Sequence, residues 1–330
     1  MTNFKQIFES HYTWIEGFMR NVRRYANRVA MIESETEKTW TYGQLNADVN
    51  RLCNALKGDG MRRGDTVMLQ MVNRPEFAFA YVACHKMQSV CCPVSYRIST
   101  GELAYNIDDS KPFAIIVCES KLESVLEAIR LANHTPKRII VASDKELPYA
   151  TRYNDYVSGV SDTEYIPETE YNIYDETCRL YTSGTTGRPK GVAMTSINEV
   201  LSAHDVMIHF PMSYKDVTIN TTPWFHRGGL HCAGPCPTFY AGASLVIMGK
   251  FDSRTALKLV QKYKITFLVG VPTVLEELAD EQMRQGYDLT TLKGIVTMGS
   301  PLERSACIRY QKVLTPNIFN GYGTTETLWN

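Results

Sequence analysis

Residues 181–191 read Tyr-Thr-Ser-Gly-Thr-Thr-Gly-Arg-Pro-Lys-Gly and continue a predicted strand that begins at Arg179. Glycines let backbone N–H groups approach a ligand closely, and the serine and threonine hydroxyls add further donors. Lys190 adds a compact positive charge, which favours an anionic ligand. We therefore predict that this loop cradles a polyphosphate, and that the ligand is a nucleoside triphosphate.

The loop differs from the phosphate loop of the common NTPases. That pattern, G-x-x-x-x-G-K-[ST], requires a glycine before its lysine and a hydroxyl residue after it to hold magnesium. Counting from Gly184, the sixth position is Pro189, and Gly191 follows Lys190. Proline also removes one backbone donor from the cradle. These differences argue against a standard P-loop.

The order Thr-Ser-Gly-Thr-Thr-Gly-x-Pro-Lys-Gly instead resembles the phosphate loop of the acyl-adenylate-forming superfamily. That superfamily includes acyl-CoA synthetases, adenylation domains of peptide synthetases and beetle luciferases. The resemblance implies that the phosphates of ATP are held by Thr182, Ser183, Gly184, Thr185, Thr186, Gly187 and Lys190.

Further segments match this superfamily in the same order along the chain. Residues 40–45 resemble its Thr-Tyr-x-x-Leu element, and the region of Pro93, Arg97 and Glu102 is similar to that of acyl- and aryl-CoA synthetases. Residues 223–226, Pro-Trp-Phe-His, resemble the Pro-x-Phe-His segment that borders the acyl and pantetheine tunnel. The resemblance implies a substrate pocket formed by Trp224, Phe225, His226, Arg227, Met298, Gly299 and Gly323.

Two later segments resemble the adenine-binding part of the superfamily. Residues 298–302 are similar to Gly-Gly-Ala-Pro-Leu, with Met298 in place of the first glycine, and residues 320–326 resemble Tyr-Gly-x-Thr-Glu. An aromatic ring offers a face to adenine, and the Glu326 carboxylate offers a hard oxygen ligand to Mg²⁺. The nucleotide contacts implied are Gly299, Ser300, Pro301, Asn320, Gly321, Tyr322, Gly323, Thr324 and Thr325. The catalytic residues implied are Lys190, His226, Thr325 and Glu326.

Short apolar runs alternate with amphipathic segments along most of the chain. A hairpin is predicted around residues 34–38, and further strands at 66–71, 114–118, 138–141, 179–182, 217–221, 244–248, 266–269, 294–298 and 317–320. Helices are predicted within 4–28 and at about 43–58, 75–87, 101–109, 120–132, 196–209, 253–263, 272–284 and 303–313. Near-continuous apolar strands separated by helices indicate a buried, mainly parallel sheet, so the predicted class is α/β.

The length of 330 residues exceeds that of one ordinary domain. The resemblance implies two side-by-side αβαβα subdomains with mainly parallel sheets, as in the N-terminal domain of acyl-CoA synthetases. The first subdomain is expected at residues 62–195 and ends in the phosphate loop. The second is expected to combine residues 1–61 with 196–330. Residues 145–176 are predicted as a surface connection, and the C-terminal lid domain is expected to be missing.

The composition indicates a small-molecule partner. Lys and Arg number 35 and so do Asp and Glu, which gives no global field to attract nucleic acid or an anionic membrane. No run of about 18 apolar residues predicts a membrane span. The first residues are polar and charged, unlike a secretory signal, and the nine scattered cysteines are predicted to be reduced and mostly buried. A cytoplasmic location is therefore predicted.

The resemblance implies a two-step reaction. A carboxylic acid attacks MgATP to give acyl-AMP and pyrophosphate, and the thiol of CoA then displaces AMP. The lysine that contacts the carboxylate during adenylation is expected beyond this chain, so the 330 residues alone are expected to be inactive or very slow. An adenylation enzyme that loads a carrier protein and a non-catalytic acyl- or nucleotide-binding protein remain alternatives. Medium-chain, aromatic and carnitine-like acids all remain open, as does the oligomeric state.

Overall fold

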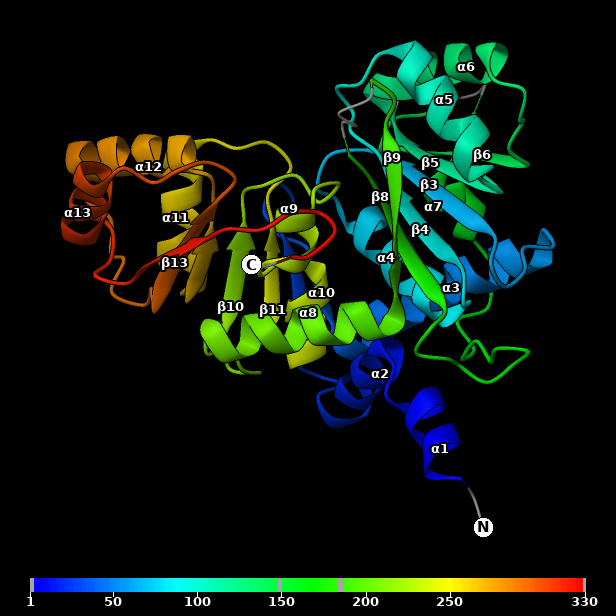
Figure 1. Cartoon of the computed structure of the whole chain (residues 1–330), viewed down its shortest axis with the longest axis horizontal. Helices are drawn as coiled ribbons and strands as arrows, with labels where there is room; N and C mark the ends of the chain where they lie inside the picture. Colours follow the sequence, from blue (N-terminus) through cyan, green and yellow to red (C-terminus); the bar gives the residue numbers. More distant parts are fainter. Residues whose placement is uncertain (1–2, 148–149, 183–186, 329–330) are drawn as a thin grey trace. The chain divides into compact units, whose positions relative to one another are not determined.

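The structure, a computed structural model, describes residues 3–147, 150–182 and 187–328. Strands and helices alternate along the chain, and the strands form two seven-stranded sheets accompanied by helices (Figure 1). Most neighbouring strands pair in parallel, which confirms the predicted α/β class. Within the described ranges, no helix combines the length and the apolar character that a bilayer-spanning segment needs.

The chain forms two compact units. Unit 1 consists of Met1–Arg20 and Gly43–Val200, and unit 2 consists of Asn21–Tyr42 and Leu201–Asn330. The sequence-based division, which groups residues 1–61 with the C-terminal part, differs from this arrangement. The difference arises because helix α3 (Tyr42–Gly58) is fastened within unit 1, where Lys86 donates hydrogen bonds to Asn46 (2.8 Å) and Asn50 (2.5 Å).

Unit 1 contains one sheet with the strand order β7-β6-β5-β3-β4-β8-β9. Its strands are β3 (Thr66–Gln70), β4 (Val90–Pro93), β5 (Ala114–Cys118), β6 (Arg138–Ala142), β7 (Thr151–Arg152), β8 (Glu176–Thr182) and β9 (Lys190–Thr195). Only the last pair, β8 with β9, is antiparallel among the pairings described for this sheet. Its other elements are α1 (Phe4–His11), α4 (Pro75–Lys86), α5 (Thr100–Ser110), the 3₁₀ helix η1 (Glu119–Lys121), α6 (Leu122–Leu131) and α7 (Tyr153–Val157).

The core of unit 1 explains why its central strands read as continuous apolar runs. Every residue of β3 and β5 is buried, because side chains on both faces of the sheet are covered. On one face, Ile115 and Val117 pack with Leu103 and Ile107 of α5 and with Val125 of α6. Alternation between apolar and polar residues is therefore absent from these strands.

Unit 2 contains the second sheet, with the strand order β14-β13-β12-β10-β11-β1-β2. Its strands are β1 (Val29–Glu33), β2 (Thr39–Thr41), β10 (Val217–Asn220), β11 (Ser244–Ile247), β12 (Phe267–Val269), β13 (Gly294–Met298) and β14 (Ile318–Gly321). Its helices are α9 (Arg227–His231), α10 (Pro235–Ala241), α11 (Ser253–Tyr263), α12 (Pro272–Gln285) and α13 (Arg304–Val313). Two further helices, α2 (Trp14–Arg24) and α8 (Ser196–His209), carry the chain from unit 1 into unit 2.

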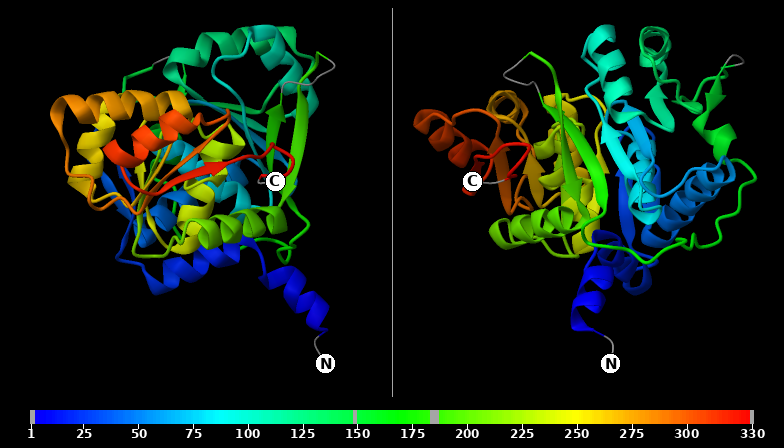
Figure 2. Two further views of the ribbon diagram at one scale, coloured as in Figure 1. Left: turned by 60° about the vertical axis from the view of Figure 1, so that its left-hand side comes forward. Right: turned by 45° about the vertical axis from the view of Figure 1, so that its right-hand side comes forward.

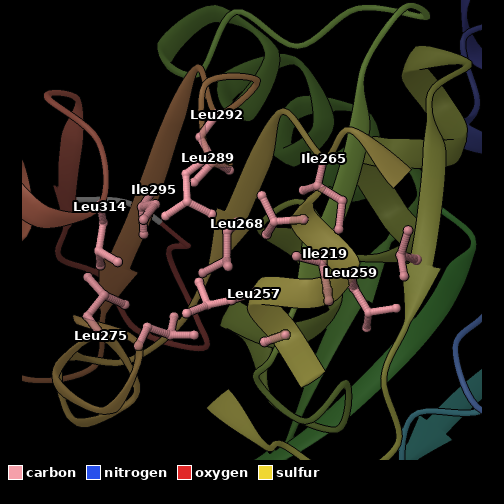
Figure 3. Packing of buried hydrophobic residues seen from close by; sticks show 14 of the residues in the cluster. Ile219, Leu257, Leu259, Ile265, Leu268, Leu275, Leu289, Leu292, Ile295 and Leu314 are labelled. Atoms are coloured by element: carbon pink, nitrogen blue, oxygen red, sulfur yellow. The ribbon is translucent and has the colours of Figure 1, made fainter. Parts of the chain in front are cut away.

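The two faces of the unit 2 sheet carry different cores. Leu268 packs on the face covered by Leu257 of α11 and Leu275 of α12, as Figure 3 shows. Its neighbours Phe267 and Val269 point to the opposite face and pack with α8, which runs along that face (Figure 2). Because successive strand residues alternate between faces, three consecutive apolar residues serve two cores.

Most predicted elements coincide with observed ones, and the differences have local causes. The sequence pattern does not predict β4, β7 or β9, and it does not predict α7, α9 or α10. Helix α9 contains two glycines and α10 contains two prolines, which weaken any helical signal. Pro235 nevertheless suits the first turn of α10, where the missing N–H has no helical partner.

Candidate active site

The predicted phosphate loop is the connection of a β-hairpin. Strands β8 and β9 pair with Thr182 opposite Lys190 and Tyr181 opposite Gly191. The register sets Thr182 and Lys190 side by side at the base of the loop. A strand rather than a helix follows the loop, so this connection also differs in structure from a standard P-loop.

The residues of the loop that the structure describes are accessible to a ligand. Gly187, Arg188 and Lys190 are exposed, and Gly187 has a φ of 86°, which favours glycine. The Arg188 guanidinium lies 6.0 Å from the centre of the Tyr105 ring. The predicted phosphate ligands Ser183, Gly184, Thr185 and Thr186 lie outside the described residues.

Contacts within unit 1 hold the base of this hairpin. The Tyr181 hydroxyl donates a 2.5 Å hydrogen bond to Asp109 of α5, and burial, aided by Asp109, raises the pKa of Tyr181 far above its ordinary value. Tyr181 therefore remains a neutral donor. A Cβ at Gly191 would lie 3.0 Å from the side chain of Arg179, so the smallest residue suits this position. Arg179 is itself held by Glu176 at 2.7 Å.

In unit 2 the candidate residues follow three strands of the parallel sheet. Asn220 ends β10, Met298 ends β13 and Gly321 ends β14. Residue Asn220 pairs with Val269 of β12, and Met298 pairs with Gly321. Since parallel strands end at the same edge of a sheet, segments 222–228, 299–301 and 322–326 all leave from one edge. Ligands of open α/β sheets bind at such an edge.

Asn220 organises the turn after β10, although no sequence pattern marks it as a candidate. Its side chain is buried and donates hydrogen bonds to the carbonyls of Gly228 (3.0 Å), Gly229 (3.0 Å) and Cys232 (2.5 Å). Its Oδ1 accepts a 2.8 Å bond from the Thr222 N–H. An asparagine at the end of a strand ordinarily indicates only a turn. The sequence pattern therefore does not predict the hydrogen bonds that Asn220 makes to Gly228, Gly229 and Cys232.

The predicted acyl-pocket residues after β10 occupy different environments. Trp224 and Phe225 are buried, whereas His226 is exposed at the start of α9, with its ring 4.2 Å from that of Phe225. Arg227 is buried, and its guanidinium binds Ser202 (2.9 Å) and His231 (3.3 Å). Within unit 2, Arg227 therefore supports the turn, and His226 is the residue that faces solvent.

Met298 lies against the turn at Gly228. A Cβ at Gly228 would come within 2.5 Å of the Met298 sulfur, which shows how closely the two segments approach. Gly299 follows with a φ of 86°, and Gly299, Ser300 and Pro301 are exposed. The structure thus brings Met298 next to the segment that carries the predicted pocket residues.

The segment after β14 is largely exposed. The Tyr322 side chain is 71% exposed, and Gly323, Thr324 and Glu326 are exposed as well. Hydrogen bonds shape the turn, because the Thr324 N–H reaches the Thr327 hydroxyl (3.3 Å) and the Leu328 N–H reaches the Thr324 carbonyl (3.0 Å). An accessible ring and an accessible carboxylate suit the adenine and Mg²⁺ roles predicted for Tyr322 and Glu326.

A cavity of about 430 Å³ lies beside this segment within unit 2. It is bounded by Asp205, His209 and Phe210 of α8 and by residues 318–322 along β14. The sequence pattern identifies Asn320, Gly321 and Tyr322 but not the α8 residues. On a helix, Asp205 and His209 resemble any exposed i,i+4 pair, so only the packing of α8 beside β14 identifies them.

The family model described as AMP-binding enzyme matches residues 18–329. The chain belongs to the AMP-binding enzyme family. The match covers both units and all the candidate segments named above. The predicted superfamily resemblance is therefore confirmed, while the roles of individual residues remain predictions.

Members of this family with curated names are similar to the chain over most of its length. A feruloyl-CoA synthase of Amycolatopsis sp is 29% identical over 292 residues, which is 87% of this chain and 54% of that protein. A crotonobetaine/carnitine–CoA ligase of Salmonella paratyphi B is 28% identical over 259 residues, 77% of this chain and 50% of that protein. The chain thus spans about half the length of these relatives.

A solved structure supports the fold. The anthranilate CoA ligase AuaEII, in complex with anthranoyl-AMP, superposes with a TM-score of 0.86 at 23% identity. The alignment covers 96% of this chain and 60% of that chain. At this identity, the likeness establishes the fold shared within the AMP-binding family.

Proposed function

We propose that this chain provides the acyl- and nucleotide-binding part of an AMP-forming acid–thiol ligase. The observation that carries the proposal is the family match over residues 18–329, within which the candidate segments occur in order. The names of the relatives, which are CoA synthases and ligases, support CoA rather than a carrier protein as the acceptor.

The proposed reaction has two steps. A carboxylate oxygen attacks the α-phosphorus of ATP and expels pyrophosphate, which leaves an acyl-AMP. The sulfur of CoA then attacks the acyl carbon and expels AMP. Both steps bring anions together, so positioning and electrostatic stabilisation supply most of the rate enhancement.

Each unit supplies part of the proposed machinery. In unit 1, Thr182, Gly187 and Lys190 of the hairpin contact phosphate oxygens, and in the proposal Ser183–Thr186 complete this cradle. In unit 2, the Tyr322 ring contacts adenine, and Thr325 donates a hydroxyl to phosphate. The acyl group lies near Trp224, Phe225, His226 and Met298. The exposure of Lys190 and Tyr322 supports these roles, since a ligand has access to both.

The Glu326 carboxylate is a suitable ligand for Mg²⁺. This ion prefers oxygen ligands and keeps several waters, binding through one or two carboxylates together with substrate phosphates. An exposed single carboxylate such as that of Glu326 matches this pattern better than a closed protein cage would. When bound, Mg²⁺ would offset the negative charge of the phosphates.

An acid-dependent pyrophosphate-release screen tests the proposal. The protein, incubated with MgATP, CoA and a panel of acids, is expected to release one pyrophosphate and one AMP for each thioester formed. Without the acid the signal should stay at background. Absence of pyrophosphate with every acid would favour the non-catalytic alternative.

A further inference from the structure

The 430 Å³ cavity of unit 2 has the size of a small-molecule site. One side consists of Asp205, His209 and Phe210, which lie in the last turns of α8 and directly after it. The other side follows β14 and ends at Tyr322, so the cavity adjoins residues proposed above to contact the nucleotide. An acyl chain attached to that nucleotide would have this cavity within reach.

Aromatic rings form part of the wall. Phe210 is buried and anchored in the core with Val206 and Met212, so its ring is held in place. The rings of Phe210 and Phe319 meet edge to face, with centroids 5.2 Å apart and an interplanar angle of 62°. The faces of aromatic rings carry partial negative charge, and they attract cations, above all when water is excluded.

The charge of the cavity is negative. Among the described residues that line it, Asp205 is a carboxylate, and none is lysine or arginine. His209 lies 3.3 Å from Asp205 through Nδ1 and is a cation only when protonated. Burial raises the pKa of the nearby Cys232 thiol, and Asp205 raises it further, so that thiol stays neutral. Tyr322, which directly follows β14, is the one titratable side chain that the other side of the described lining contributes.

We propose that this cavity receives the acyl part of a carboxylic acid that carries a cationic nitrogen. The Asp205 carboxylate is the counter-ion, and Phe210 and Phe319 provide the aromatic surface. This inference rests on the proposed function, because it treats the cavity as the continuation of the acyl-AMP site. It selects an ammonium-bearing acid over an uncharged medium-chain or aromatic acid. A neutral chain of equal size would gain the same apolar contacts but would form no ion pair with Asp205.

Two matched acyl-adenylate mimics test the charge directly. The first is 5′-O-sulfamoyladenosine acylated with 4-(trimethylammonio)butanoate. The second carries 5,5-dimethylhexanoate, in which carbon replaces the nitrogen without a change of shape. Calorimetric titration of the chain is expected to give a dissociation constant at least about tenfold lower for the cationic mimic. Equal binding, or tighter binding of the neutral mimic, would overturn the inference and leave the proposed function intact.

Two variants test whether Asp205 causes the preference for the cationic mimic. Asp205→Asn is expected to remove the preference for the cation while leaving the affinity for the neutral mimic unchanged. Glu277→Gln removes one exposed carboxylate of α12 that does not line the cavity, and it should keep the preference. If both variants lost the preference for the cationic mimic to the same extent, the preference would reflect the general charge of the protein, and the assignment of Asp205 would be contradicted. If neither mimic nor ATP binds to the unmodified chain, the proposed function fails together with the inference.

Discussion

The hairpin of unit 1 and the parallel edge of unit 2 assemble their candidate residues in opposite ways. In the hairpin, Thr182 and Lys190 come from one continuous stretch, and adjacent antiparallel strands bring them together. At the edge of unit 2, the segments after β10, β13 and β14 come from three separate stretches of the chain, 222–228, 299–301 and 322–326. Three separate strand pairings, over the order β14-β13-β12-β10, bring these segments to one place.

The difference predicts whether a substitution in each region mainly changes ligand binding or mainly changes the free energy of unfolding. A local hairpin depends on its own register and on a few neighbours, so changes there should affect ligand contacts more than stability. The edge of unit 2 depends on close packing between distant segments, as at Gly229, where an added Cβ would lie 1.9 Å from the Pro223 carbonyl oxygen. Changes there should affect stability first.

Gly229→Ala should give the largest effect. The clash involves backbone, which cannot move without disturbing the turn that Asn220 organises, and we expect a loss of about 3 kcal/mol or more. Urea unfolding followed by tryptophan fluorescence measures it. Gly228→Ala is the matched control, because its new Cβ meets only the flexible end of Met298, and it should cost about 1 kcal/mol. Equal costs would contradict the distinction between backbone and side-chain contact.

Lys86→Met tests a long-range contact of unit 1. The Lys86 side chain is buried and forms an ion pair with Glu164, whose side chain is 46% exposed. Losing the ammonium leaves Glu164, Asn46 and Asn50 without their shared donor, and we expect a loss of about 2 kcal/mol. A change below about 0.5 kcal/mol would show that unit 1 does not depend on this contact.

The pH dependence of Glu164→Gln checks the same ion pair. Burial raises the pKa of Glu164, but hydrogen bonds from Lys86, Asn46 and Asn50 outweigh it and hold that pKa below the ordinary value of 4.5. A depressed carboxyl pKa stabilises the folded state above pH 4.5, and this stabilisation is lost as the pH falls through the lower folded pKa. The advantage of the unmodified chain over Glu164→Gln should therefore shrink on acidification.

Lys190→Ala tests the hairpin. Loss of its positive charge should weaken ATP binding about tenfold with little change in unfolding free energy, because the side chain is exposed. Calorimetric titration with MgATP measures the affinity. Lys5→Ala removes an equally positive side chain from α1 of the same unit, and it should leave the affinity unchanged. Unchanged affinity in Lys190→Ala would remove the phosphate role from this lysine.

Glu102→Ala should give the smallest effect. Glu102 completes a capping box with Ser99 at the start of α5, where its carboxylate accepts a 3.0 Å bond from the Ser99 N–H. Its loss should cost about 0.5–1 kcal/mol and leave ATP affinity unchanged. Weaker ATP binding would instead indicate that the resemblance of this region to acyl-CoA synthetases reflects a ligand contact.

Local patterns predicted much of the fold. The strands at 114–118 and 294–298 have the predicted bounds, because buried parallel strands are short apolar runs with clear ends. Strand β9 was not predicted, because it begins with Lys190 and Gly191 of the glycine-rich loop and because Met194 is its only buried residue. The nine cysteines, all of which lie in the described ranges, form no disulfide there, and eight of them are buried, as predicted for small apolar side chains.

By itself, the sequence determined the family, the α/β class and the loop at 181–191, because these depend on residue types in a fixed local order. Only the tertiary structure decided that this loop closes an antiparallel hairpin, that Arg227 is engaged with Ser202 and His231, and that Asp205 lines a cavity beside β14. Each of these depends on which distant strand or helix lies alongside. That choice follows from how buried surfaces fit together, which no local pattern records.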